Sequence, residues 1–113
     1  MEINSVLNQI VSNLMPADPY KIVLFGSYAR GTAAPNSDID LMVVLDSERI
    51  SESYSEKLER NWKVKKLVLN INYQYPMDFK IYSRGEFDIL KKKGSFFIDE
   101  IEKTGKTIYE KWN

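Results

Sequence analysis

An unbroken apolar run at residues 41–45, entered directly from Asp38-Ile-Asp40, constrains the fold of this chain more than any other feature. Five consecutive apolar residues favour a strand that is buried on both faces in the middle of a sheet. Side chains two positions apart on a strand point to the same face, so Asp38 and Asp40 share one, with Cα atoms about 6.6 Å apart at ~3.3 Å per residue. We interpret residues 38–45 as this strand.

The two aspartates allow two interpretations. In the simpler one, Asp38 caps the strand and Asp40 points to solvent at the edge of the sheet. The position of Asp40 favours the other, because it adjoins the apolar run where the strand leaves the core, and an unpaired carboxylate there is costly. Two carboxylates on one face repel each other, and they can bracket a pair of metal ions about 3.5–4 Å apart. Asp38 and Asp40 are therefore predicted metal ligands.

The rest of the chain alternates predicted strands and helices. Short apolar or β-branched runs predict further strands at residues 20–25, 77–82 and 107–109. Helical spacing and capping residues predict helices at residues 6–14, from Ser53 or Ser55 to about residue 69, at 84–93 and at 95–103. This order is typical of the α/β (α+β) class, with a small mixed β-sheet flanked by helices.

Several aromatic and basic residues receive structural interpretations. The long helix carries Leu58, Trp62, Lys65 and Leu69 near one stripe. We expect Trp62 and Trp112 to be packing anchors rather than base-stacking platforms. Tyr73 and Tyr75, in the loop before Pro76, are expected to be partly buried, although they could line a nucleotide pocket. Residues 91–93 are three lysines, which is typical of a solvated helix end that complements the helix dipole; contact with RNA or a partner is the alternative.

Composition narrows the chemistry and the partners. A length of 113 residues fits one domain, 1–113. The chain has no cysteine and no histidine, so catalysis or metal binding must rely on carboxylates, lysines, tyrosines or hydroxyls. The formal net charge is zero, which makes nucleic acid an unlikely direct partner. No signal peptide and no membrane-length apolar stretch is visible, so we expect a cytoplasmic protein without a membrane partner.

A phosphate-binding turn is predicted at Gly26 and Ser27. They follow a predicted strand and open a helical turn that Gly31 closes. The start of a helix offers backbone N–H groups and the positive end of the dipole, which attract phosphate. Gly26 lets the backbone approach closely, the Ser27 hydroxyl can contact the same oxygens, and Arg30 lies one turn on. Taken alone, a Gly-Ser turn after a strand is most often only a turn.

Asp78 is the third carboxylate candidate. It begins another predicted strand, where Asp78, Lys80 and Tyr82 share one face. Phosphoryl transfer needs mainly positioning and charge neutralisation, which metal ions held by three carboxylates supply. The simpler interpretation is a strand-end carboxylate without a role. Lys80 is a nucleotide-binding candidate, since it shares the strand face of Asp78.

These motifs together resemble a known family. The run GSYARGTAAPNSDIDLMVVL resembles the signature of the DNA polymerase β-like nucleotidyltransferase superfamily, and in particular the minimal nucleotidyltransferase (MNT) family. PMDFKIYSRGEF resembles its third-carboxylate strand, and GSFFIDEIEKTGKTIYE its C-terminal end, so the resemblance spans about residues 20–110. It implies the polymerase β-like palm fold, phosphate binding at Gly26 and Ser27, paired metal ligands at Asp38 and Asp40, and an Asp78 that completes the metal site and orients the acceptor hydroxyl.

The resemblance also implies an activity and a partner. The expected reaction transfers a nucleoside monophosphate, AMP from ATP, to a hydroxyl acceptor with two Mg²⁺ ions (Mn²⁺ is possible). Larger superfamily members carry an acceptor-binding domain, for which residues 1–113 leave no room, so the acceptor is expected to be a protein or to be presented by a partner in a homo-oligomer. MNT antitoxins modify a tyrosine of a helical HEPN toxin. The alternatives are an adenylyltransferase for an aminoglycoside-like small molecule and a non-catalytic antitoxin that acts by binding alone.

Overall fold

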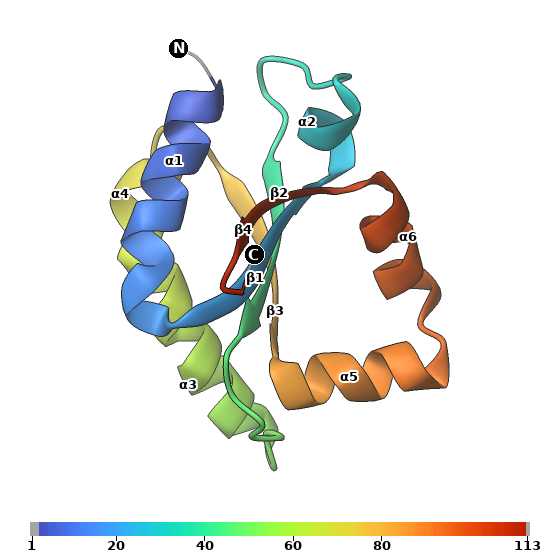
Figure 1. The fold of residues 1–113 in the computed structure, drawn as a ribbon. Coiled ribbons are helices and arrows are strands. Elements are labelled where there is room, and N and C mark those ends of the chain that lie inside the picture. The colour runs from blue at the N-terminus through green and yellow to red at the C-terminus, as the bar shows by residue number, and fades with distance from the viewer. Residues whose placement is uncertain (1–2, 113) are drawn as a thin grey trace.

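The computed structural model describes residues 3–112, in which one four-stranded sheet is flanked by helices (Figure 1). Short 3-10 turns, η1 and η2, follow α1 and α3. The elements in chain order are α1 (Ile3–Leu14), η1 (Met15–Ala17), β1 (Pro19–Phe25), α2 (Gly26–Arg30), β2 (Ile39–Leu45), α3 (Tyr54–Lys65), η2 (Lys66–Val68), α4 (Leu69–Asn72), β3 (Met77–Ser83), α5 (Arg84–Lys93), α6 (Phe96–Thr104) and β4 (Lys106–Glu110).

The sheet is mixed, as its sequence pattern predicts. The strand order is β3-β2-β1-β4; β1 runs antiparallel to both β2 and β4, and β2 runs parallel to β3. The parallel pair is joined through α3 and α4, because parallel strands need a crossover connection. The C-terminal end of β1 and the N-terminal ends of β2 and β3 therefore meet at one end of the sheet, where α2 also lies (Figure 1). This architecture confirms the predicted α/β (α+β) class.

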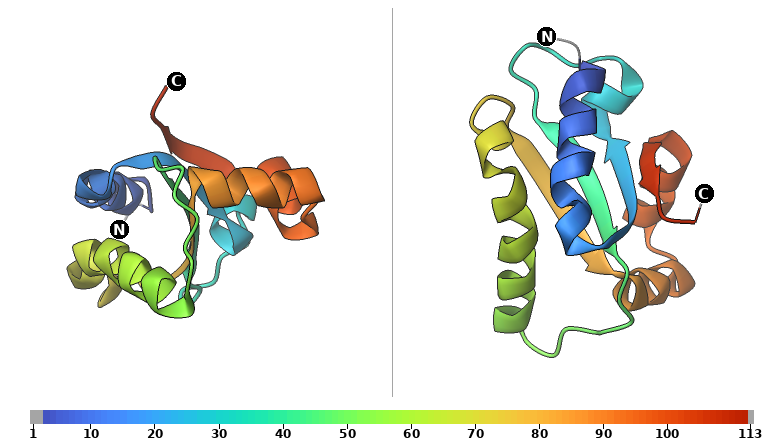
Figure 2. Two further views of the ribbon diagram at one scale, coloured as in Figure 1. Left: turned by 90° about the horizontal axis from the view of Figure 1, so that it is seen from below. Right: turned by 60° about the vertical axis from the view of Figure 1, so that its left-hand side comes forward.

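Helices cover both faces of the sheet, which places β1 and β2 in the centre of the core. The α1 and α3–α4 helices lie on one side of the sheet, and α5 and α6 lie on the other (Figure 2). Alternate residues of β2 therefore enter two apolar clusters: Leu41 and Val43 join one, and Met42 and Val44 join the other. All five residues 41–45 are buried, which confirms the strand predicted from the apolar run.

The long polar helix differs from its prediction. It begins after the predicted cap Ser53, whose side chain accepts a hydrogen bond from Glu56 N, but α3 ends at Lys65, and the chain continues through η2 and α4 to Asn72. Its core-facing residues are Val64, Val68 and Ile71. The predicted stripe that includes Leu58 and Trp62 points away from the sheet instead.

The predictions for three aromatic residues, Trp62, Trp112 and Tyr73, are wrong, because all three side chains are exposed. Trp62, on the outer face of α3, and Trp112, after β4, are both more than half exposed and are not packing anchors of this chain. Tyr73 is almost fully exposed, whereas Tyr75 is half-buried against the core, as predicted. Residues 91–93 are exposed at the end of α5, as expected of a solvated helix end. Within residues 3–112, no helix has the combination of length and apolar character that crossing a membrane requires.

Candidate functional site

Three side chains line up across the sheet at the end where α2 lies. The antiparallel register places Phe25 of β1 beside Asp40 of β2, and the parallel register places Asp40 beside Asp78 of β3. Residues paired in register point to the same face, with neighbouring strands about 4.8 Å apart. This is the face covered by α5 and α6, since Val23 and Met42 of the next row pack there. Asp40 and Asp78, 38 positions apart in the sequence, are thereby neighbours.

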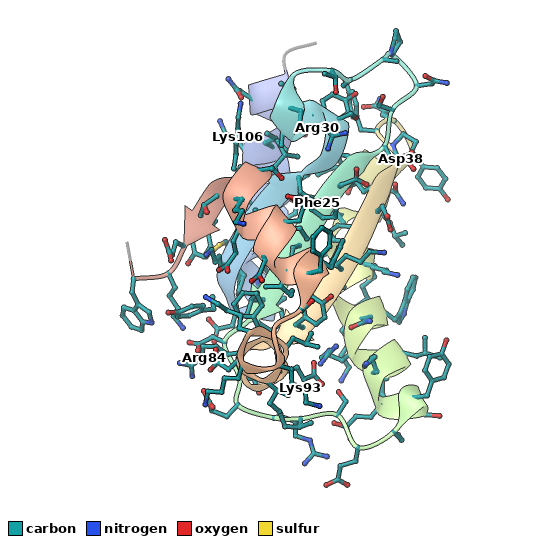
Figure 3. The ribbon with its side chains drawn as sticks, turned by 90° about the vertical axis from the view of Figure 1, so that its right-hand side faces the viewer. Phe25, Arg30, Asp38, Arg84, Lys93 and Lys106 are labelled. Atoms are coloured by element: carbon teal, nitrogen blue, oxygen red, sulfur yellow. The ribbon has the colours of Figure 1, made fainter. Side chains whose placement is uncertain are left out.

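Asp38 lies just outside this row. It precedes the first residue of β2 and is exposed, at the tip of the sheet (Figure 3). The backbone fixes its position, because Ile39 N donates a hydrogen bond to the Pro76 carbonyl at 2.9 Å and so ties the start of β2 to the start of β3. Asp38, Asp40 and Asp78 are together called the aspartate cluster below.

Gly26 is in direct contact with this cluster. Its φ is +72°, in the left-handed region that favours glycine, and it starts α2 immediately after β1. A Cβ added at Gly26 would overlap Oδ2 of Asp40 and would come within 3.0 Å of its Cγ. That this glycine leaves room for a phosphate stays a prediction; the structure shows that it leaves room for the Asp40 carboxylate.

The three carboxylates of the cluster carry more negative charge than the nearby cations offset. Burial raises the pKa of Asp40 above its ordinary value, and the charges of Asp78 and Asp38 raise it further. The cations of Lys80 and Arg30 act in the opposite direction but do not outweigh the other effects. Lys80 Nζ also lies 3.8 Å from Asp78 Oδ2, and both side chains are about half exposed. A bound cation would relieve this repulsion.

The donor set of the cluster fits a hard divalent cation. Its ligating groups are carboxylate oxygens, which Mg²⁺ and Mn²⁺ favour over nitrogen or sulfur. Within residues 3–112, no three acidic side chains already converge as a ready-made metal site. Asp38 and Asp78 are exposed and can turn towards a cation, whereas Asp40 is half-buried against Gly26. The chemistry of these side chains therefore fits the predicted metal, and Asp40 is the carboxylate whose position the fold fixes.

Two aromatic residues beside the cluster were not singled out from the sequence. The ring of Phe97, on α6, meets Phe25 edge-on, with centroids 5.8 Å apart and planes at 90°. Phe25 thus forms an apolar wall beside Asp40 (Figure 3). The sequence signal that could have revealed Phe25 is its position directly before Gly26, at the end of the predicted strand. Phe97 has no such signal, since only the fold brings α6 to β1.

An open depression of about 230 Å³ lies at the other end of β3. Its lining includes Tyr82, Glu86 and Leu90 and none of the aspartates of the cluster. Glu86 is already held there by Arg60, with 2.6 Å between Nη1 and Oε1. We place the candidate site at the aspartate cluster, because it brings together carboxylates without an equivalent cationic partner.

Comparisons with known proteins identify the family of this chain. The family model described as a nucleotidyltransferase domain matches residues 5–107. Two Methanocaldococcus jannaschii proteins, each named "Putative protein adenylyltransferase", are similar in sequence. MJ1305 is 28% identical over 98% of this chain and 74% of its own length. MJ1379 is 56% identical over 37% of this chain, a stretch that spans 44% of that relative.

Two solved structures share the fold. One is the crystal structure of a putative nucleotidyltransferase from Sulfolobus solfataricus, with a TM-score of 0.61 and 18% identity over 96% of this chain and 83% of the other. The second is described as a toxin-antitoxin with AMP-PNP, with a TM-score of 0.58 and 22% identity over 94% of this chain and 74% of the other. At these identities the likeness concerns the fold.

Proposed function

Because this chain belongs to the nucleotidyltransferase domain family, we propose that it transfers AMP from ATP to a hydroxyl group of a partner protein, with Asp38, Asp40 and Asp78 as the residues that hold two Mg²⁺ ions. One observation carries the proposal: the parallel register sets Asp40 beside Asp78, at the end of the sheet where Asp38 and the Gly26 turn also lie. Mn²⁺ is an alternative to Mg²⁺.

The residues around the cluster have separate roles in this proposal. The turn at Gly26 and Ser27 binds the phosphates of ATP through its backbone N–H groups and the Ser27 hydroxyl. Arg30 and Lys80, whose charges reach Asp40, offset the charge of the triphosphate. When bound, the metal ions neutralise the phosphate oxygens and lower the barrier for displacement at the α-phosphorus.

The reaction forms one bond and breaks one. The acceptor oxygen bonds to the α-phosphorus, the bond from that phosphorus to the α–β bridging oxygen breaks, and pyrophosphate leaves. Asp78 orients the acceptor hydroxyl and accepts its proton, since its carboxylate is exposed at the edge strand β3, where an acceptor can approach. Asp40 is half-buried behind it and holds its position against Gly26.

A protein acceptor is favoured by the relatives. Both curated relatives are named as protein adenylyltransferases, and one structure with this fold is described as a toxin-antitoxin complex with an ATP analogue. We therefore propose that the acceptor is a tyrosine of a helical HEPN-type toxin and that this chain is its antitoxin, acting in the cytoplasm.

The test is co-expression with the protein encoded by the neighbouring gene, followed by intact mass measurement of that partner. The wild type should add one or more AMP units to it and protect the cells. Asp78→Ala should still bind ATP and the partner but leave the partner unmodified and the cells unprotected, a loss in the chemical step. Asp88→Ala removes an exposed carboxylate of α5 and serves as the matched control. Protection by Asp78→Ala with an unmodified partner would show instead that the chain acts by binding alone.

A further inference from the structure

Large apolar side chains are exposed along one side of the α3–α4 segment, away from the aspartate cluster. Four-residue steps keep side chains on one face of a helix, and Tyr54, Leu58 and Trp62 follow such steps. Leu69 and Tyr73 continue on the same face after η2. The exposed fractions are 75% for Tyr54, 51% for Leu58, 53% for Trp62, 40% for Leu69 and 89% for Tyr73. These five residues are called the outer stripe below.

The outer stripe is not the side of the segment that packs on the core. The opposite side of the same segment buries Val64, Val68 and Ile71 against the sheet. The segment stands on the outside of the molecule next to α1, with its other side open (Figure 2). Single exposed apolar residues are ordinary, but a row that contains a tryptophan and two tyrosines, interrupted by Lys65 between Trp62 and Leu69, is typical of an interface.

The charges beside the stripe indicate what covers it. Glu59 lies in the middle of α3 and Lys66 directly after it, seven residues or about two helical turns apart, so both lie on the same flank of the stripe. Glu59 is only loosely engaged, since its Oε1 is 3.8 Å from Lys63 Nζ and both side chains are largely exposed. One end of this flank is therefore acidic and the other is basic.

This arrangement is complementary to itself. When two identical helices pack antiparallel about a two-fold axis, the same flank of each faces the other, and residue i of one lies opposite residue j of its partner and vice versa. With the axis next to Trp62, Glu59 of each copy faces Lys66 of the other, which makes two opposite-charge pairs. A parallel two-fold arrangement would instead set this flank of each copy against the opposite flank of its partner, so that Glu59 and Lys66 would not meet.

We propose that the outer stripe is the interface through which two copies of this chain pair, with their α3 helices antiparallel and Trp62 at the two-fold axis. The aspartate cluster lies on the other side of the sheet, with α5 and α6, so that pairing leaves both clusters open. The inference is independent of the proposed reaction, because it rests on α3 and α4 alone.

Sedimentation velocity of the full chain, from low to high micromolar concentration, tests the pairing. The wild type should show a concentration-dependent monomer–dimer equilibrium. Trp62→Arg should weaken it by about a thousandfold, because each copy loses one anchor of a kind that contributes most of the binding energy. Leu58→Lys should have the same direction of effect. Phe96→Arg, at an even more exposed apolar residue on α6, should leave the dimer intact.

The charge pairs give a second readout that only self-association can produce. Glu59→Lys should weaken the dimer roughly tenfold, since two exposed ion pairs become repulsive. Adding Lys66→Glu in the same chain should restore the affinity, because the pairs then re-form with reversed sign. A wild type that stays monomeric, a dimer that Trp62→Arg and Phe96→Arg affect equally, or a double variant as weak as Glu59→Lys would each overturn the proposal and assign the stripe to a different partner or to none.

Discussion

Glu86 should be the most important single carboxylate for the stability of this fold at neutral pH. It is the third residue of α5 and forms a capping box with Ser83, in which each side chain bonds the backbone N–H of the other. Its other oxygen accepts a hydrogen bond from Ser51 N at 2.9 Å, and Arg60 Nη1 donates to Oε1 at 2.6 Å. Glu86 thereby ties the start of α5 to the loop before α3 and to α3 itself.

The size of the effect follows from the pKa. Burial alone raises the pKa of Glu86, but the hydrogen bonds from Ser51, Ser83 and Arg60 outweigh it and lower the pKa from 4.5 to about 2. A difference of about 2.5 pKa units corresponds to about 3 kcal/mol of folding free energy. Because the folded pKa is the lower one, this stabilisation is complete above pH 4.5 and is lost as the pH falls towards 2.

Urea unfolding of Glu86→Gln and of the wild type, followed by far-UV circular dichroism from pH 7 to pH 2, measures this contribution. Circular dichroism is the suitable probe because both tryptophans are largely exposed. We expect Glu86→Gln to lose about 2–3 kcal/mol of unfolding free energy at pH 7. The difference in unfolding free energy between the variant and the wild type should narrow as the pH falls from 4.5 towards 2. Glu59→Gln, whose ion pair is exposed, is the control and should change stability by less than about 1 kcal/mol. A Glu86→Gln effect that is smaller than the control, or that does not depend on pH, would refute the reasoning.

Three further predictions concern the aspartate cluster. Asp40→Asn should abolish AMP transfer but keep or raise the melting temperature, because burial and the neighbouring carboxylates raise the pKa of Asp40, so that its charge opposes folding. Scanning calorimetry should find the full gain above the folded pKa and none below the unfolded value of 3.8, where Asp40 is protonated in folded and unfolded chains alike. Gly26→Ala should both destabilise the fold and impair ATP binding, since the added Cβ overlaps Asp40. Ser27→Ala should leave the melting temperature unchanged and weaken ATP binding by about ten- to a hundredfold in titration calorimetry. Equal melting temperatures for the two variants would contradict this difference. ATP should raise the melting temperature of the protein in the presence of Mg²⁺ or Mn²⁺ but not in excess chelator. Stabilisation by ATP in excess chelator would show that ATP binding does not depend on the metal.

The strands were predictable because their patterns are local. Residues 41–45 are apolar without interruption and form a central strand, and the alternation of Asp78, Lys80 and Tyr82 with apolar neighbours defines an edge strand with one polar face. The register between β2 and β3 was not predictable, because it depends on how α3 and α4 pack across the sheet between them. The distance between Asp40 and Asp78 is therefore the part of the candidate site that required the structure.

The α3 segment shows why a helical period does not by itself identify the buried face. The segment is apolar on two sides, so that the stripe of Leu58 and Trp62 and the row of Val64, Val68 and Ile71 both satisfy a helical period. The larger side chains suggested the wrong side. The smaller, β-branched row fits the close approach to the sheet, whereas the wider aromatic row remains outside and is available to a second chain.

The turn at Gly26 connects two features that the sequence predicted separately, the phosphate-binding turn and the Asp40 carboxylate. Sequence reasoning placed a phosphate there because a glycine precedes a helical turn, and the same glycine was explained by close approach of a ligand. The structure shows that Gly26 meets the Asp40 carboxylate first, since a Cβ at this position would overlap Oδ2. The Gly26 turn and Asp40 are therefore one steric unit, because a Cβ at Gly26 would displace the Asp40 side chain. In the proposed site, a cation bound by Asp40 would lie next to a phosphate on this turn. The φ of +72°, which glycine adopts without strain, lets the chain turn from β1 into α2 in direct contact with Asp40.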